Sequence, residues 1–303
     1  MAMAATSIIT TMETATKTDI NIQSQCYSCF LKTYQRLFEK FMLTQEQQDE
    51  FLDFFHKTLG KFKNSTSPEV QRELNQGFSK IVGIEDLFED EKINSNSIAL
   101  GLYNDWSTQV PISKNPFDLA LKLSIAGNIM DYGANNNFDI KSTIRRVIFA
   151  EFAINHSKQL QDKIKEAKSI LYLADNAGEI LFDKLFIETI NHPNITYAVR
   201  GGFALNDATL HDAIDVGMNS VARVIENGFD APATVLAKCS SEFMEVYNSA
   251  DLVISKGQGN LEGLINENDP RIFFLLMVKC DVMANLLNVA KGSFIVYNPT
   301  KLD

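Results

Sequence analysis

The sequence predicts an α/β protein in which an all-helical N-terminal region precedes a mainly parallel sheet. From Cys26 to about Asn155 the apolar residues recur with the period of an α-helix, and the alternation typical of strands is nearly absent. From about Ala167 onward, short runs of β-branched and apolar residues alternate with helical stretches. Buried apolar strands that alternate with helices indicate a parallel sheet covered by helices on both faces.

The first element, residues 1–24, is expected to be a poorly ordered extension. Its first twenty residues are rich in Ala, Thr and Met, and they lack both the apolar segment of a signal peptide and the Arg-rich pattern of a transit peptide. Residues 25–165 follow as the helical region. Short polar breaks divide this region and predict a cluster of several helices. The breaks are at 63–68, 94–97 and 133–137.

Residues 166–303 form the predicted α/β domain. Six apolar runs have the length and composition of buried strands, namely 169–173, 195–199, 222–225, 252–255, 273–278 and 293–297. Helical periodicity lies between several of them, at 179–190, 207–216, 241–248 and 279–289. This order of elements predicts strands whose carboxyl ends meet at one edge of the sheet.

The composition of the chain narrows its partners. The net charge is −10 and the Lys and Arg residues form no basic cluster, so nucleic acid is not an expected partner. The apolar runs, such as 272–278, are far shorter than the roughly 20 residues that cross a bilayer, so no membrane span is expected. Four cysteines in a chain able to bury a large core do not require disulfides, and a reducing cytoplasm is the expected location. The oligomeric state stays open.

Three polar segments that contain glycine follow predicted strands. They are LADNAGE from Leu173, RGGFALND from Arg200 and SKGQGN from Ser255. Ligands of open parallel sheets bind beyond the carboxyl ends of the strands. We therefore expect the three segments to converge on one crevice that holds the functional site.

Asp175, Asn176 and Asp207 are the predicted metal ligands. Asp175 and Asn176 follow the first predicted strand and Asp207 follows the second, so their oxygen atoms can meet at adjacent strand ends. Hard cations such as Mg²⁺ and Mn²⁺ prefer carboxylate and carbonyl oxygens. Each Asp alone could instead be a helix N-cap. The placement of oxygen ligands at two neighbouring strand ends favours the metal site.

A phosphate site is predicted beside the metal. Lys256 is followed by Gly257 and Gly259, whose small size lets backbone amides approach a ligand beside a cation. Arg200 and Gly201 have the same character. Both segments could also be ordinary turns, because glycine is common where a strand turns into a helix.

Cys26 and Cys29 have the spacing of a redox pair or of half a zinc site. A structural zinc site needs four ligands, and only Cys239 and Cys280 remain to complete it. We therefore prefer the interpretation that Cys26 and Cys29 are buried cysteines on a helix.

Ordered motifs along the chain resemble the DUF89 family, also called damage-control phosphatases or ARMT-like proteins. The motifs are Cys26-Tyr-Ser-Cys29-Phe30, Ala126-Gly127-Asn128-Ile-Met-Asp131-Tyr-Gly133, Asp175-Asn176-Ala-Gly178-Glu179, Arg200-Gly201 with Asn206-Asp207-Ala-Thr, Lys256-Gly257-Gln-Gly259-Asn260-x-Glu262, and Lys279-Cys280. The resemblance implies a three-layer α/β/α Rossmann-like domain joined to the helical region, and a phosphatase activity supported by Mn²⁺, Co²⁺, Ni²⁺ or Mg²⁺. The CxxC spacing is similar to that of the shorter prokaryotic-type branch.

The resemblance also implies roles for single residues. It assigns the metal to Asp175, Asn176 and Asp207, in agreement with the reasoning from strand ends. Asn128 and Asp131 would line the same pocket from the helical region, although a helix end with its cap would give the same pattern.

Together, the residues and the resemblance predict a metal-dependent phosphomonoester hydrolase acting on small phosphorylated metabolites, such as sugar phosphates or damaged phosphometabolites. The expected catalytic residues are Asp175, Lys256, Asp131 and Glu179, the last two as candidate proton donors or acceptors. The expected phosphate ligands are Asn128, Arg200, Gly201, Lys256, Gly257, Gly259, Asn260 and Lys279. Either a water molecule or Asp175 could attack phosphorus. The alternatives are a non-catalytic metal- or sugar-phosphate-binding protein and a carboxyl methyltransferase.

Overall fold

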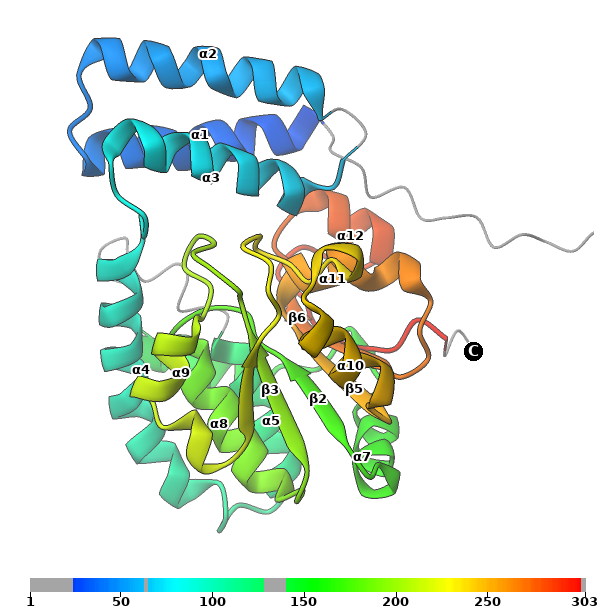
Figure 1. The fold of residues 1–303 in the computed structure, drawn as a ribbon. Helices are drawn as coiled ribbons and strands as arrows, with labels where there is room; N and C mark the ends of the chain where they lie inside the picture. Colours follow the sequence, from blue (N-terminus) through cyan, green and yellow to red (C-terminus); the bar gives the residue numbers. More distant parts are fainter. Residues whose placement is uncertain (1–23, 63–64, 128–139, 301–303) are drawn as a thin grey trace, which may run out of the picture.

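The computed structural model describes residues 24–62, 65–127 and 140–300. In these ranges seven strands form a single sheet, helices cover both of its faces, and a bundle of three helices lies at one end (Figure 1). The predicted α/β class is confirmed. No helix in these ranges is both long and apolar enough to cross a membrane. The predicted extension lies outside the described residues except for Ser24, as does the predicted break at 133–137.

The sheet has the strand order β1-β7-β6-β5-β2-β3-β4, and all neighbouring strands are parallel except β6 and β7. The strands are β1 Ile154–Asn155, β2 Ile170–Leu173, β3 Ile195–Val199, β4 Arg223–Glu226, β5 Leu252–Lys256, β6 Ile272–Met277 and β7 Phe294–Tyr297. Strand β2 lies between β3 and β5 and runs parallel to both, so the carboxyl ends of these three strands meet at one edge. The three polar segments follow the strands at this edge.

Alternating strand residues enter two different cores. Ile170 and Tyr172 of β2 lie in one core, whereas Leu171 and Leu173 lie in the other, because successive side chains of a strand point to opposite faces. The first core is completed by α4 Glu89–Gln109, α5 Pro116–Ala126, α6 Ile140–Phe149, α7 Ser157–Glu166, α8 Glu179–Ile190 and α9 Leu210–Asp215. The second is completed by α10 Ser241–Ser249, α11 Gly257–Leu264 and α12 Asp281–Leu287.

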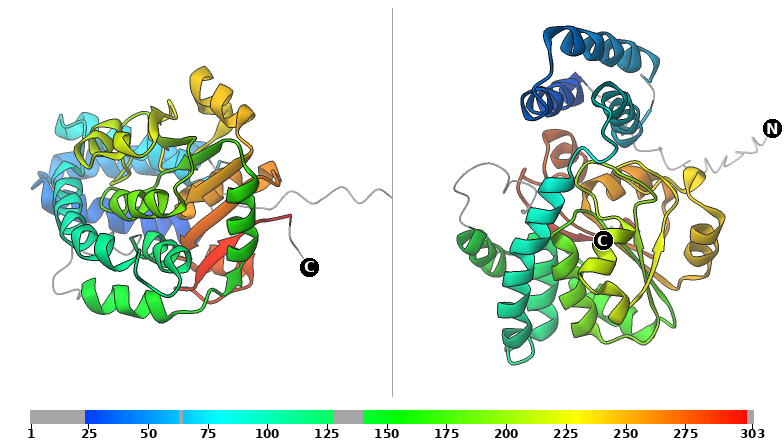
Figure 2. Two further views of the ribbon diagram at one scale, coloured as in Figure 1. Left: turned by 90° about the horizontal axis from the view of Figure 1, so that it is seen from below. Right: turned by 60° about the vertical axis from the view of Figure 1, so that its left-hand side comes forward.

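Helices α1, α2 and α3 form a bundle with an aromatic core of its own. Their bounds are Ser24–Lys40, Gln45–Lys61 and Ser67–Val82. Tyr34, Phe51 and Phe78, one from each helix, are fully buried with ring centroids 4.6 to 5.6 Å apart. Aromatic pairs at such separations add about 0.5–1.5 kcal/mol beyond the burial of their area. The bundle lies over the edge where the carboxyl ends of β2, β3 and β5 meet, as two further views show (Figure 2).

The structure differs from the sequence prediction in three elements. Residues 94–97, predicted to be a break between helices, lie inside α4, because polar Asn96 there bonds Asp212 and the N–H of Gly178 and does not end the helix. Ile154–Asn155 adds β1 to the sheet inside the range predicted to be helical, because the backbone N–H groups of Ala153 and His156 donate to carbonyl oxygens of β7. This partner lies far along the chain, so no local pattern indicates the strand. The segment SKGQGN, predicted to be polar chain after a strand, has no loop of its own, since Ser255 and Lys256 end β5 and Gly257 begins α11.

Candidate active site

Three strand ends supply the residues of the candidate active site. Asp175 lies two residues beyond β2, Arg200 follows β3 directly, and Lys256 is the last residue of β5. All three side chains are buried. The expectation that the polar segments converge is therefore met at the level of the backbone, because these strands are direct neighbours in the sheet.

The three predicted metal ligands are brought together by backbone pairing. Asn176 and Asp207 form an isolated antiparallel bridge, and the N–H of Ala208 donates to the carbonyl oxygen of Asp175 at 2.8 Å. These contacts join the segment after β2 to the segment after β3. The main-chain positions of Asp175 and Asp207 are thus fixed by hydrogen bonds between the two segments.

The first of two buried ionic groups, here called the arginine cluster, consists of Arg200, Asp175 and Asp207, which are 2%, 6% and 3% exposed. Nε of Arg200 donates to Oδ2 of Asp207 at 2.5 Å, and Nη2 lies 3.7 Å from Oδ1 of Asp175. Among the described residues, this Nη2 has no hydrogen-bond partner. A buried donor without a partner costs about 1–3 kcal/mol. The arginine cluster therefore contains one N–H group, at Nη2 of Arg200, that has no described acceptor and lies beside two carboxylates.

Asn260 holds the guanidinium of Arg200 in place. Its Oδ1 accepts hydrogen bonds from Nη1 of Arg200 and from the N–H of Thr234, both at 2.8 Å. Its Nδ2 donates to the carbonyl oxygens of Ala174 at 2.9 Å and Lys256 at 2.8 Å. The predicted phosphate ligand Asn260 is thus engaged by protein groups on both its oxygen and its nitrogen, where it joins the ends of β2 and β5.

The second group, here called the lysine cluster, consists of Lys256, Glu179, Asp183, Tyr172 and Tyr197, all fully buried. Nζ of Lys256 donates to Oδ1 of Asp183 at 2.6 Å, to the carbonyl oxygen of Ser124 at 2.9 Å and to Oε1 of Glu179. The hydroxyl groups of Tyr172 and Tyr197 donate to the two oxygens of Asp183 at 2.8 and 2.9 Å. A lysine has three donors, and all three are used here.

The charges of the lysine cluster set its protonation. Burial alone would lower the pKa of Lys256, but the charges of Asp183 and Glu179 outweigh it, so the pKa is raised and the ammonium stays charged. Burial raises the pKa of Glu179 against the opposing charge of Lys256. Asn176 connects the two clusters, because its Nδ2 donates to Oδ2 of Asp175 at 2.9 Å and to Oε2 of Glu179 at 3.3 Å.

Gly257 lets the start of α11 pass directly against Asp175. Its φ is +79°, and a Cβ at this position would lie 2.0 Å from Oδ2 of Asp175, so no other residue fits without displacing the carboxylate. Gly201 and Gly259 are likewise close to main-chain atoms of other loops. Packing alone accounts for these glycines, and their predicted contact with phosphate stays a prediction.

The donor set of the site fits a hard divalent cation. Asp175 and Asp207 offer carboxylate oxygens and Asn176 an amide oxygen, the ligand types that Mg²⁺ and Mn²⁺ prefer. Across the two clusters, four buried carboxylates face two buried cations, so negative charge is in excess. Half-buried Lys279 offsets part of that excess, since its charge opposes the rise in the pKa of Glu179. Within the described ranges no three His, Cys, Asp or Glu side chains form a group that could hold a metal ion.

Two predicted residues of the helical region, Asn128 and Asp131, lie outside the described residues. Their neighbour Gly127 is buried, and a Cβ added to it would lie 2.9 Å from Cγ of Glu179. The chain therefore passes beside the lysine cluster at Gly127. Lys279 follows β6, where its backbone N–H donates to Oε1 of Gln258 at 2.9 Å.

Sequence reasoning missed Asp183 and Asp230. Asp183 lies four residues after Glu179 in α8, so both carboxylates face the same side of the helix. The available signal was a charge inside an apolar stretch. Asp230 accepts hydrogen bonds from Arg72 and, at 2.7 Å, from Gln76 of α3, which ties the bundle to the loop after β4. These partners lie 158 and 154 residues away in sequence, so no local pattern indicates them.

The cysteine motif and Glu262 lie apart from both clusters in the described contacts. Cys26 and Cys29 are on α1 as expected, but Cys29 is exposed, so the prediction that both are buried is wrong. Glu262 is buried in α11 and accepts a hydrogen bond from Nε2 of Gln258 at 2.9 Å. Burial raises the pKa of Glu262 to about 7.

Comparison with known proteins gives one family along nearly the whole chain. The pattern of the damage-control phosphatase ARMT1-like domain matches residues 22–295. The chain is 32% identical over 282 residues to a damage-control phosphatase of Pyrococcus horikoshii, covering 91% of this chain and 97% of that protein. It is 28% identical over 288 residues to a damage-control phosphatase of Archaeoglobus fulgidus, covering 91% and 98%. The crystal structure of a DUF89 family protein from Pyrococcus horikoshii matches with a TM-score of 0.85 at 31% identity, covering 92% and 99%.

Proposed function

Because the chain belongs to the damage-control phosphatase ARMT1-like family, we propose that it is a divalent-metal-dependent phosphatase of small phosphorylated metabolites. The phosphatase role rests on relatives that carry this name and align with nine-tenths of the chain. The metal and the substrate class rest on the arrangement of the site.

One observation carries the proposal. Asp175 and Asp207, from two adjacent strand ends, flank a buried Arg200 whose Nη2 has no hydrogen-bond partner among the described residues. Buried polar groups almost always form hydrogen bonds, so a guanidinium nitrogen that has none among the described residues, and whose nearest carboxylate oxygen is 3.7 Å away, favours a bound ligand at this place. A phosphate oxygen would accept a hydrogen bond from Nη2, and the carboxylates of Asp175 and Asp207 would hold a cation.

In this proposal Asp175, Asn176 and Asp207 hold the cation. A bound divalent cation supplies Lewis-acid chemistry by polarising a phosphoryl oxygen. Arg200 donates from Nη2 to a second phosphate oxygen, while its contacts with Asp207 and Asn260 keep the guanidinium oriented. Preorganised positive charge beside the equatorial oxygens is the main expected source of catalysis in phosphoryl transfer.

Lys256 has a different position from Arg200. Its three hydrogens all point to protein acceptors, so contact with phosphate requires one of these bonds to be exchanged. Its predicted direct role on phosphate stays a prediction. We assign the phosphate-binding charge first to Arg200, with half-buried Lys279 as the second candidate.

Glu179 is proposed to orient Asn176, because Oε1 pairs with Lys256 and Oε2 accepts from the Asn176 amide. This hydrogen bond turns the amide nitrogen of Asn176 toward Glu179. The amide oxygen of Asn176 is then directed to the proposed cation. Water and Asp175 remain alternative nucleophiles in this proposal.

The test is phosphate release from p-nitrophenyl phosphate and a panel of sugar phosphates by protein stripped of metal and resupplied with Mn²⁺, Co²⁺, Ni²⁺ or Mg²⁺ in turn. Turnover restored by metal is the expected result. Calorimetry of metal binding accompanies it. Metal binding without release from any ester would instead favour a non-catalytic binding protein, and turnover that survives complete removal of metal would contradict the metal assignment.

A further inference from the structure

Helix α4 packs along α8 and reaches the start of α9, so it contacts both segments that carry the proposed metal ligands (Figure 1). Asn96 of α4 is bonded to both of them. Its Oδ1 accepts a hydrogen bond from the N–H of Gly178 at 2.6 Å, and its Nδ2 donates to Oδ1 of Asp212 at 3.0 Å. One side chain of α4 therefore joins the chain that follows Asn176 to the chain that follows Asp207.

The partners of Asn96 fix the orientation of its amide. A backbone N–H can only donate, and an ionised carboxylate can only accept. Burial would raise the pKa of Asp212, but hydrogen bonds from Thr209 and the charge of Lys92 outweigh it, so the pKa is lowered and the side chain is ionised. The oxygen of Asn96 must therefore face Gly178 and its nitrogen must face Asp212. A turned amide would lose both bonds.

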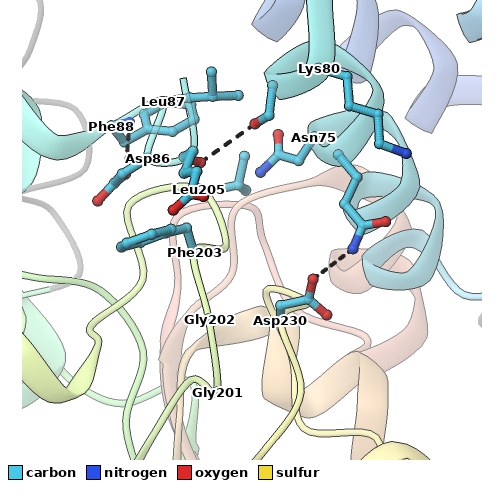
Figure 3. Close-up of a pocket in the computed structure, with 13 residues that line it drawn as sticks. Asn75, Lys80, Asp86, Leu87, Phe88, Gly201, Gly202, Phe203, Leu205 and Asp230 are labelled. Carbon is cyan, nitrogen blue, oxygen red and sulfur yellow. Dashed lines mark hydrogen bonds between the residues drawn. The ribbon is translucent and has the colours of Figure 1, made fainter. Parts of the chain in front are cut away.

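Asp212 is held at the start of α9 from other directions as well. Its Oδ2 accepts hydrogen bonds from the N–H of Thr209 at 2.9 Å and from the hydroxyl of Thr209 at 2.7 Å. Nζ of Lys92 lies 3.2 Å from the same oxygen and 2.8 Å from Oδ2 of Asp86. Lys92 also lies over the ring of Phe203, and Figure 3 shows Asp86 and Phe203 on the same side of a cavity next to α3. These contacts occupy Oδ2 of Asp212, and its Oδ1 accepts from α4.

Gly178 is a point of conformational freedom in the main chain. Its φ is +78°, a conformation that residues with side chains rarely adopt, and a Cβ here would lie 2.9 Å from Cβ of Ser95 in α4. The residue before it is held by main-chain pairing, because the N–H of Ala177 donates to the carbonyl oxygen of Asn206 at 2.9 Å. The hydrogen bond to Asn96 continues this restraint to Gly178, where a glycine would otherwise let the chain change direction.

The conformation at Gly178 sets how Glu179 faces Asn176. Glu179 is the next residue, and its Oε2 accepts a hydrogen bond from Nδ2 of Asn176 at 3.3 Å. The proposed function directs the oxygen of this amide to the cation. A change in chain direction at Gly178 would move Glu179 and release the Asn176 amide from that orientation.

We propose that Asn96 is a positioning residue that holds the two metal-binding segments in place through Gly178 and Asp212. The inference rests on the proposed phosphatase function and adds a part for α4, which supplies none of the proposed metal or phosphate ligands. Hydrogen-bond partners of metal ligands typically change metal affinity by about 10–100-fold. Because Asn96 acts through the main chain and not on a ligand directly, we expect an effect at the lower end of this range.

The experiment measures the affinity of the full chain for Mn²⁺ by calorimetry, together with urea unfolding of the metal-free protein. Asn96→Ala removes both hydrogen bonds and should weaken Mn²⁺ binding about tenfold. Asn94→Ala, on an exposed position of the same helix, is the control and should bind Mn²⁺ as the wild type does. A lower stability of Asn96→Ala with unchanged affinity of the folded protein would reduce Asn96 to a packing role and overturn the proposal.

A reciprocal exchange tests the hydrogen bond between Asn96 and Asp212. Asp212→Asn alone should weaken Mn²⁺ binding about tenfold, because its new amide nitrogen would face the amide nitrogen of Asn96. Adding Asn96→Asp reverses donor and acceptor across this contact and keeps an acceptor for the N–H of Gly178. Affinity should then return to within about twofold of the wild type. Adding Asn94→Asp to Asp212→Asn restores the net charge without the contact and should not rescue binding.

The outcomes separate this role from the proposed function. Wild-type protein that binds no divalent cation would overturn the metal assignment and the role of Asn96 together. Wild-type binding that is unchanged in Asn96→Ala would overturn the role alone, as would a reciprocal exchange that rescues no better than the Asn94→Asp pair. Metal binding without release of phosphate from p-nitrophenyl phosphate would contradict the phosphatase alone, since affinity decides the role of Asn96.

Discussion

The arginine cluster and the lysine cluster are built from similar groups and differ in how completely those groups are paired. Each sets one buried cation, located at the end of a strand, against two carboxylates. Lys256 directs three hydrogens to three protein acceptors. Arg200 leaves Nη2 without a partner among the described residues.

From this difference we expect a structural role for the lysine cluster and a ligand-binding role for the arginine cluster. A fully satisfied buried network stiffens its surroundings, and removing one member exposes an uncompensated charge to a low-dielectric interior. An incompletely satisfied network can gain a ligand without losing internal bonds. We therefore expect substitutions in the arginine cluster to act mainly on activity, and those in the lysine cluster mainly on stability.

The largest expected effect is the loss of activity in Asp175→Asn and Asp207→Asn. Each change removes one negative charge from the proposed cation ligands while keeping the shape of the side chain. Turnover should fall by about 1,000-fold or more, as expected for several kcal/mol of lost Lewis-acid stabilisation. Metal affinity from calorimetry should fall in parallel. Asp215→Asn, in the exposed last turn of α9, is the control, and full activity in both site variants would remove these residues from the metal site.

The next effect is on the free energy of unfolding in Asp183→Asn. The substitution takes one carboxylate from Lys256 and weakens the acceptor shared by Tyr172 and Tyr197. Breaking a buried ion pair on one side should cost about 3 kcal/mol, measured by urea unfolding. Asp49→Asn, on the exposed surface of α2, should be neutral. If Asp183→Asn instead kept its stability and lost turnover, the contrast between the two clusters would be wrong.

Glu262 is a buried carboxylate outside both clusters, and its described partner is the amide of Gln258 and not a cation. It therefore shows what burial does to a carboxylate that has no cation beside it among its described contacts. Burial raises its pKa from 4.5 to about 7, so the folded state binds this proton more tightly than the unfolded state. Its contribution to stability is therefore greatest below about pH 4.5 and is lost as the pH rises toward 7. Glu262→Gln should be more stable than the wild type at pH 8 by up to about 3 kcal/mol, and the difference should vanish near pH 4. Urea unfolding at both pH values measures this, and a pH-independent difference would contradict it.

The smallest effect is expected in Tyr197→Phe. The change deletes one hydroxyl that donates to Asp183 at 2.9 Å and leaves the ring in the core. Stability should fall by about 1 kcal/mol with turnover nearly unchanged. Tyr103→Phe removes an exposed hydroxyl bonded to Glu188 and should cost less. A loss of turnover in Tyr197→Phe without a loss of stability would give the lysine cluster a direct part in catalysis.

Much of the fold was predictable because it follows from local patterns. The apolar runs gave six of the seven described strands to within a few residues, and the predicted helix 179–190 coincides with α8. The ordered motifs predicted the family, which the match over residues 22–295 confirms. Strand β1 was missed, because only its pairing with β7 makes two residues of chain into a strand.

The sequence by itself determined which residues stand at the strand ends, since apolar periodicity and glycine positions act over a few neighbouring residues. Asp175, Asn176 and Asp207 could be chosen in this way. Only the tertiary structure decided which charges are satisfied, because the partners are distant along the chain. Lys256 meets Glu179 across 77 residues, and Arg200 meets Asn260 across 60. Pairing over such distances depends on strand order, and that is why all three hydrogens of Lys256 are bonded while Nη2 of Arg200 has no hydrogen-bond partner in the described ranges.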